Sequence, residues 1–92
     1  MMPMDLRGFK QFIIESLHLD GMTPEMIGDD QPLFGAGMGL DSVDALELVV
    51  ALERRLSLKI PAHEIDRDAF TSPAAMFRFV ERRLAGQAGR AG

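Results

Sequence analysis

The chain has 92 residues, no cysteine and a formal net charge of −4 at pH 7. This length predicts one small domain, and the lack of cysteine excludes disulfides, thiol nucleophiles and cysteine metal sites. The acidic balance disfavours nucleic acid as a partner. No apolar run approaches the about 20 residues of a membrane span, and the N-terminal residues lack a signal-peptide pattern, so we expect a cytoplasmic protein without membrane insertion.

The first predicted element is an amphipathic helix that follows a tail of residues 1–4 and has Asp5 as its N-cap. Apolar residues recur at helical spacing on the inner face, at Leu6, Phe9, Ile13 and Leu17. Polar residues take the outer face, at Arg7, Lys10, Gln11, Glu15 and Ser16. The helix should end near Leu19, before a glycine. Thr23 is then expected to cap one or two turns that begin at Pro24.

A long glycine-rich connection, residues 28–40, follows and carries Gly35, Gly37 and Gly39 on alternate positions. Connections of this length are uncommon in small domains unless they serve a function. The dinucleotide motif needs a preceding strand, and the P-loop needs a lysine after its last glycine. Neither is present, so the sequence excludes both kinds of nucleotide loop.

Residues 42–56 form the strongest predicted helix. Charged side chains share one narrow face, at Asp44, Glu47, Arg54 and Arg55. Apolar residues cover most of the remaining surface, so we expect this helix to pack on two sides at the centre of a bundle. Glu53 falls on the apolar side. We expect its carboxylate to reach a backbone donor or to lie at the end of the bundle, because a lone buried carboxylate is costly.

The rest of the chain predicts two more helices. An extended segment at 58–61 leads to a short helix at 63–70, and residues 71–73 (Thr-Ser-Pro) supply a cap and a first-position proline for the last helix. The inner face of that helix carries Met76, Phe77, Val80 and Leu84. The predicted fold class is all-α, a bundle of three longer helices and one short helix with a long loop between the first two. The domain spans 5–85, and 86–92 should be a disordered tail.

The start of the 42–56 helix presents a serine in a particular setting. Asp41 is a good N-cap, and Asp44 three residues later completes a capping box. If Asp41 supplies the cap, the Ser42 hydroxyl is left beside unpaired amides and the positive end of the helix dipole. A phosphate ester placed there would be stabilised. Helix physics alone also allows that Ser42 merely helps to cap the helix.

The stretch GLDSVDALELVVALERRLSLKIP, residues 39–61, resembles the core of acyl carrier proteins. In that family a Gly-x-Asp-Ser-[Leu/Val] signature opens the second helix, and its serine holds 4′-phosphopantetheine, whose thiol carries the acyl group. The resemblance implies covalent attachment at Ser42, with Gly39, Leu40 and Asp41 as neighbouring residues of the cofactor site. It extends loosely over most of the chain, and the family's fold is the four-helix bundle expected above.

The resemblance also implies partners and the surfaces that meet them. Such carriers work with a phosphopantetheinyl transferase and with acyl-loading and ketosynthase-type enzymes. We expect a monomer whose docking residues are Val43, Asp44, Glu47 and Arg54. An apolar pocket between helices would shelter the acyl chain, although each of its residues would serve equally well as ordinary core. The candidate lining residues are Leu46, Val49, Val50, Ile60, Ile65, Phe70, Met76 and Phe79.

Two departures from the family pattern indicate a specialised pathway. Arg54 and Arg55 stand where carriers of fatty acid synthesis usually have acids, and 37–39 lacks the acidic residue that is common there. Because docking depends on charge placement, we interpret the chain as a dedicated carrier for fatty-acid-like, polyketide-like or other specialised lipid synthesis. Residues 65–73 resemble carriers that accept amino acids, such as D-alanyl carriers. An aminoacyl or peptidyl cargo is therefore the alternative.

Two other classes of protein compete with the carrier interpretation. An enzyme would need a base beside its nucleophile, and neither His18 nor His63 has a required relation to Ser42, so we expect no catalysis. A helical adaptor would use the same apolar surface but would tolerate Ser42→Ala. No cluster of residues has metal-ligand spacing, and we interpret Asp29-Asp30 as a solvated turn.

Overall fold

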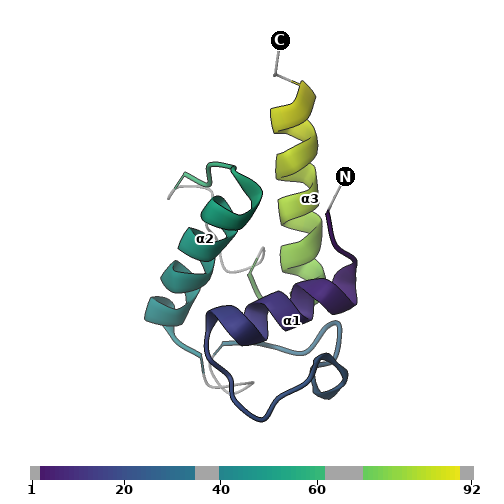
Figure 1. Cartoon of the computed structure of the whole chain (residues 1–92), viewed down its shortest axis with the longest axis vertical. Helices are drawn as coiled ribbons and strands as arrows, with labels where there is room; N and C mark the ends of the chain where they lie inside the picture. The colour runs from purple at the N-terminus through teal and green to yellow at the C-terminus, as the bar shows by residue number, and fades with distance from the viewer. Residues whose placement is uncertain (1–2, 35–39, 62–69, 90–92) are drawn as a thin grey trace.

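The computed structural model describes residues 3–34, 40–61 and 70–89 (Figure 1). In chain order the elements are the helix α1 (Leu6–Ser16), the 3-10 helix η1 (Pro24–Met26) and the helices α2 (Ser42–Leu56) and α3 (Pro73–Gly89). In Figure 1, α1 lies crosswise, with α2 and α3 rising from it. The predicted short helix at 63–70 falls almost wholly on residues outside these ranges and stays a prediction.

The helix α1 begins as predicted and ends earlier than predicted. Asp5 accepts a hydrogen bond from the backbone N–H of Gly8 at 2.8 Å, which caps the helix. At the other end, His18 has a left-handed φ of 54°, the N–H of Leu19 donates to the oxygen of Ile14, and the N–H of His18 donates to that of Glu15. This is the Schellman pattern, which usually places a glycine where His18 stands. The prediction of an end near Leu19 was therefore wrong by one turn.

The side chain of Lys10, predicted to lie on the outer face of α1, is buried. Its ammonium donates to the backbone oxygen of Ile27 at 2.7 Å and pairs with the carboxylate of Asp29. The backbone oxygen of Asp29 in turn accepts from the N–H of Ala74 at the start of α3. The turn predicted as merely solvated therefore ties α1 to α3, although the Asp29 side chain itself is largely exposed.

The 3-10 helix η1 is a single turn, as the prediction of one or two turns allows, but it lacks the predicted cap. Pro24 stands at its first position, but the Thr23 side chain makes no capping hydrogen bond. Instead, Glu25 forms an ion pair with Arg7 of α1. This single turn is therefore held by contacts with α1 rather than by a cap of its own.

The helix α2 has the predicted bounds but not the predicted surroundings. Leu48 and Leu52 are fully buried in the core. On the opposite side, the exposed fractions of Val43, Leu46 and Val50 are 62%, 60% and 47%. The prediction that α2 packs on two sides was therefore wrong, because its apolar surface is wider than the core that covers it.

The helix α3 starts as predicted and runs further. The Ser72 hydroxyl oxygen accepts from the backbone N–H of Ala75 at 3.2 Å, directly before the first-position Pro73. The helix then continues to Gly89, so its end lies beyond the boundary predicted at residue 85.

The core is formed by apolar side chains from all of these elements. Its fully buried members include Phe9, Ile13, Ile27, Leu33, Leu48, Leu52, Met76 and Val80. The described ranges contain no strand, only an isolated bridge between Phe34 and Leu40. No helix within them is long and apolar enough to cross a membrane.

Candidate cofactor-attachment site

The first turn of α2 is organised by two carboxylates. Asp41 accepts hydrogen bonds from the backbone N–H groups of Val43 at 3.0 Å and Asp44 at 3.2 Å. The carboxylate of Asp44 accepts from the N–H of Asp41 at 3.0 Å, which completes the predicted capping box. Ser42 is the first residue of the helix. Its side chain, like Gly39, lies outside the described part of the structure.

Leu40 anchors this helix start to the core. It is buried, and its N–H donates to the backbone oxygen of Leu33 at 3.4 Å. The bridge between Phe34 and Leu40 therefore brings the two ends of the loop 35–39 together. The start of α2 is thus held in place even though the connection before it is long.

The chemistry of this helix start fits a phosphate ester. Asp41 and Asp44 together complete the cap, so the turn does not depend on the Ser42 hydroxyl for its hydrogen bonds. The amides of the first turn carry the positive end of the helix dipole, which stabilises a negative group at this position. A phosphodiester on the first residue of α2 would therefore lie where the backbone favours negative charge.

The predicted docking residues share the outer surface of α2. Val43, Glu47 and Arg54 are exposed, and Asp44 is half-buried by its role in the cap. This surface has acids near Ser42 and a cation further along the helix. It has the exposure that docking needs, and the docking role of these residues stays a prediction.

The predicted pocket-lining residues do not all lie in one place. Val49, Ile60, Phe70 and Met76 are buried in the core, and Phe79 contacts the ring of Phe70 with a centroid distance of 5.6 Å. Two others, Leu46 and Val50, are exposed on α2, so their prediction as interior residues was wrong. Ile65 lies outside the described residues.

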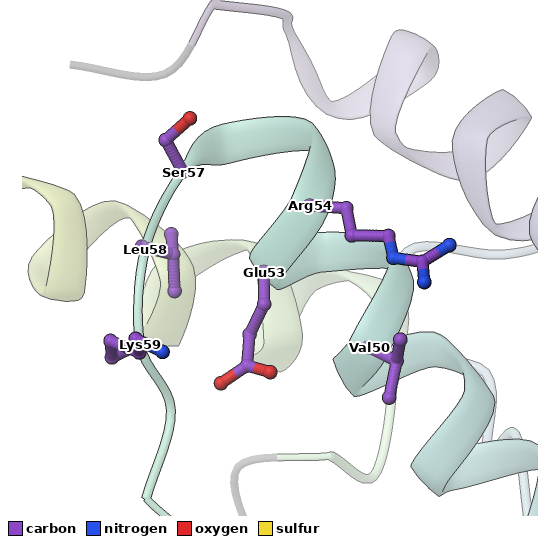
Figure 2. Close-up of a pocket in the computed structure, with 6 residues that line it drawn as sticks. All are labelled: Val50, Glu53, Arg54, Ser57, Leu58 and Lys59. Carbon is purple, nitrogen blue, oxygen red and sulfur yellow. The ribbon is translucent and has the colours of Figure 1, made fainter.

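A hollow of about 440 Å³, which no pattern in the sequence indicates, lies beside the last turn of α2. Figure 2 shows the Glu53 side chain extending between Lys59 and Val50, while the side chain of the next residue, Arg54, extends away from Lys59. The hollow forms where the chain reverses after α2, at Ser57, which has a left-handed φ of 52°. No turn signal in the sequence marks a left-handed serine here. The lining residues are Val50, Glu53, Arg54, Ser57, Leu58 and Lys59.

Comparison with known proteins identifies the class of this site. A family model described as the phosphopantetheine attachment site matches residues 12–80. The chain belongs to this family of phosphopantetheine-binding carriers. D-alanyl carrier proteins of Streptococcus sanguinis and Streptococcus gordonii are 38% and 37% identical to it over 65 residues, which cover 71% of this chain and 77% of each relative.

A solved structure supports the fold of the carrier. The holo acyl carrier protein of Nitrosomonas europaea, determined by solution NMR, superposes with a TM-score of 0.71 at 24% sequence identity. The match covers 87% of this chain and 95% of that protein. The prediction of an all-α carrier fold is thereby confirmed for its three longer helices.

Family membership decides several predictions. The carrier takes a covalent 4′-phosphopantetheine, whose thiol supplies thioester chemistry that a chain without cysteine lacks. Members of the family carry substrates and do not catalyse reactions, so the prediction that the chain is not an enzyme is confirmed. Their partners are a phosphopantetheinyl transferase and the enzymes that load or process the cargo.

Proposed function

We propose that Ser42 is the attachment residue and that the protein is a dedicated acyl carrier of a specialised pathway. The capping box carries this proposal, because Asp41 and Asp44 make the capping hydrogen bonds of the first turn of α2, so the cap does not require the hydroxyl of its first residue. The family match spans this position. The Gly-Leu-Asp-Ser-Val context at 39–43 agrees with the acyl carrier signature.

The loading step makes Ser42 the nucleophile of another enzyme's reaction. The hydroxyl oxygen attacks the phosphorus of coenzyme A that bears the pantetheine arm, and an O–P bond forms. The pyrophosphate bond breaks, and adenosine 3′,5′-bisphosphate leaves. The hydroxyl proton passes to a base of the transferase. This chain contributes the nucleophile and a rigid helix start that holds it.

The cargo has two candidate classes. The signature around Ser42 favours an acyl group, in a fatty-acid-like, polyketide-like or other specialised lipid pathway. An aminoacyl cargo is the second candidate, because the curated relatives at 38% and 37% identity are D-alanyl carrier proteins.

Partner enzymes dock, in this proposal, on the outer surface of α2. Val43 supplies an exposed apolar contact, while Asp44 and Glu47 supply negative charge close to Ser42. Arg54 and Arg55 place positive charge at the other end of the helix. Charge placement sets which partners associate and which are rejected, so this arrangement suits dedicated partners. The carrier acts as a monomer that leaves this surface free.

The mass of the protein purified from its own cells, under conditions that preserve thioesters, tests this proposal. Peptide mapping should place a phosphopantetheine on the peptide that contains Ser42. The additional mass on the arm then distinguishes an acyl group from an aminoacyl group. An arm on any other residue would contradict the assignment of Ser42.

A further inference from the structure

A row of side chains on α2 leads from the proposed attachment residue to the hollow beside Ser57. The row consists of Ser42, Leu46, Val50 and Arg54, each four residues after the previous one. Residues four apart are neighbours on one face of a helix. Leu46 and Val50, which connect the two ends, are 60% and 47% exposed. The path from the attachment residue to the hollow is therefore apolar and open.

The hollow at the end of this row carries more positive than negative charge. Arg54 and Lys59 line it, and within the described ranges neither side chain forms an ion pair or a hydrogen bond. Glu53 is the one acid among the lining residues. One of its carboxylate oxygens is already held by the backbone N–H of Ile60 at 2.8 Å. Arg54 and Lys59 lie on either side of Glu53, whose carboxylate is partly satisfied, among the residues that line the hollow (Figure 2).

We propose that this hollow receives the far end of the cargo and that the cargo class is an acyl group with a terminal carboxylate. The apolar part of the arm would lie along Leu46 and Val50, and the carboxylate would pair with Arg54 and Lys59. This inference rests on the proposed attachment at Ser42 and narrows the cargo of that same site.

The reach of the arm matches the length of the row. Arg54 lies twelve residues beyond Ser42, which is about 18 Å along the axis of α2 and about 120° around it. The arm has roughly thirteen bonds from its phosphorus to its sulfur and reaches about 16 Å when extended like a peptide backbone. The carboxylate of a four-carbon dicarboxylic acyl group would therefore arrive at Arg54.

Because the cargo is tethered to the same chain, even a site of low affinity can hold its carboxylate. An exposed ion pair contributes little by itself, because water and salt screen it. A group on a short flexible linker has an effective concentration of order mM, so a site of similar affinity is about half occupied. An aminoacyl cargo would instead bring an ammonium group toward two cations. The charges of the hollow therefore favour a dicarboxylic acyl cargo over the second candidate.

The test uses two loaded forms that differ in one terminal group. A broad-specificity phosphopantetheinyl transferase would load the apo protein from succinyl-coenzyme A or from butyryl-coenzyme A, which ends in a methyl group in place of the carboxylate. Intact mass reports the loading, and ¹⁵N–¹H spectra report the environment of Val50, Arg54 and Lys59. The succinyl form should show shifts at these residues that the butyryl form lacks, and about 0.5 M salt should reduce them.

Matched variants distinguish binding of the carboxylate in the hollow from a general effect of the protein's positive charge. Arg54→Gln with Lys59→Gln should abolish the succinyl-specific shifts, while Arg78→Gln with Arg82→Gln, two exposed arginines of α3, should keep them. Equal shifts in the two loaded forms, or shifts that survive in the first variant, would overturn the inference and leave Ser42 loading intact. Concentration-dependent shifts of the apo protein at the same residues would assign the hollow to a second copy of the chain and contradict the inference. No mass gain would overturn the attachment proposal as well.

Discussion

The carboxylate of Glu53 accepts a hydrogen bond from the backbone N–H of Ile60 at 2.8 Å. Glu53 lies near the end of α2, and Ile60 lies in the extended segment that follows the left-handed turn at Ser57. From the other side, the Arg83 guanidinium of α3 donates to the backbone oxygen of Lys59 at 2.9 Å. Side chains from two helices therefore hold this segment, which forms one wall of the hollow.

Replacement of Glu53 by alanine tests this attachment. Ile60 is buried, so its N–H would lose its acceptor where water reaches it poorly. We expect Glu53→Ala to lower the free energy of unfolding by about 1–3 kcal/mol in urea denaturation. Glu53→Gln keeps an acceptor oxygen and should cost less. Glu47→Ala, on the exposed face of the same helix, is the control and should change stability by about 0.5 kcal/mol or less. Equal stability of all three variants would show that the bond contributes nothing.

The capping predictions for α1, α2 and α3 succeeded because they depend on residues close together in the sequence, whereas the cap predicted at Thr23 of η1 does not form. Asp5, Asp41 and Ser72 each cap the helix that they were predicted to cap. The Glu53 carboxylate accepts a hydrogen bond from a backbone N–H, as predicted from its position on the apolar side of α2. Such local hydrogen bonds follow from side-chain chemistry and spacing alone.

The failed predictions for Lys10, Leu46 and Val50 depend on contacts between distant segments. Lys10 is buried because the loop carrying Ile27 and Asp29 folds over it, and nothing near Lys10 in the sequence indicates this. Leu46 and Val50 are apolar, as core residues are, and yet they are exposed. The periodicity of apolar residues does not distinguish a side chain buried in the protein's own core from one exposed for contact with another molecule. The proposed attachment residue, Ser42, is indicated by a local motif, whereas the hollow depends on the backbone conformation at Ser57.

The buried ammonium of Lys10 should contribute to stability through the carbonyl of Ile27. Lys10→Met keeps an unbranched side chain and removes the donor, which leaves a buried carbonyl oxygen without this partner. We expect a loss of about 1–3 kcal/mol in the free energy of unfolding. Asp29→Asn removes only the charge of a largely exposed partner and should cost clearly less. A larger loss in Asp29→Asn than in Lys10→Met would contradict this assignment.

The N-cap of α2 should depend on an acceptor oxygen at position 41 and not on its charge. Asp41→Ala removes both capping hydrogen bonds and should lower the free energy of unfolding by about 0.5–2 kcal/mol. Asp41→Asn keeps the acceptor oxygen and should stay close to the wild type. Thermal or urea unfolding followed by circular dichroism measures both. An asparagine variant as unstable as the alanine variant would point to a role for the charge.

The basic end of α2 should restrict which ketosynthases accept the carrier. Arg54→Glu with Arg55→Glu restores the acids usual in carriers of fatty acid synthesis, so kcat/KM with a fatty-acid ketosynthase should rise about threefold to tenfold, and less at high salt. Arg78→Glu with Arg82→Glu makes the same change in net charge on α3 and is the control. If the first variant shows no rise, or if the control rises equally, charge placement on α2 does not select the partner.

The most direct test of the central claim is the intact mass of the apo protein after incubation with coenzyme A and a broad-specificity phosphopantetheinyl transferase. Ser42→Ala is the test variant, and Ser16→Ala, at the last residue of α1, is the matched control. The wild type and Ser16→Ala should each gain one phosphopantetheine, and Ser42→Ala should gain none while its circular dichroism shows that it is folded. A gain in Ser42→Ala, or no gain in the folded wild type, would contradict the assignment of Ser42 as the residue that carries the arm.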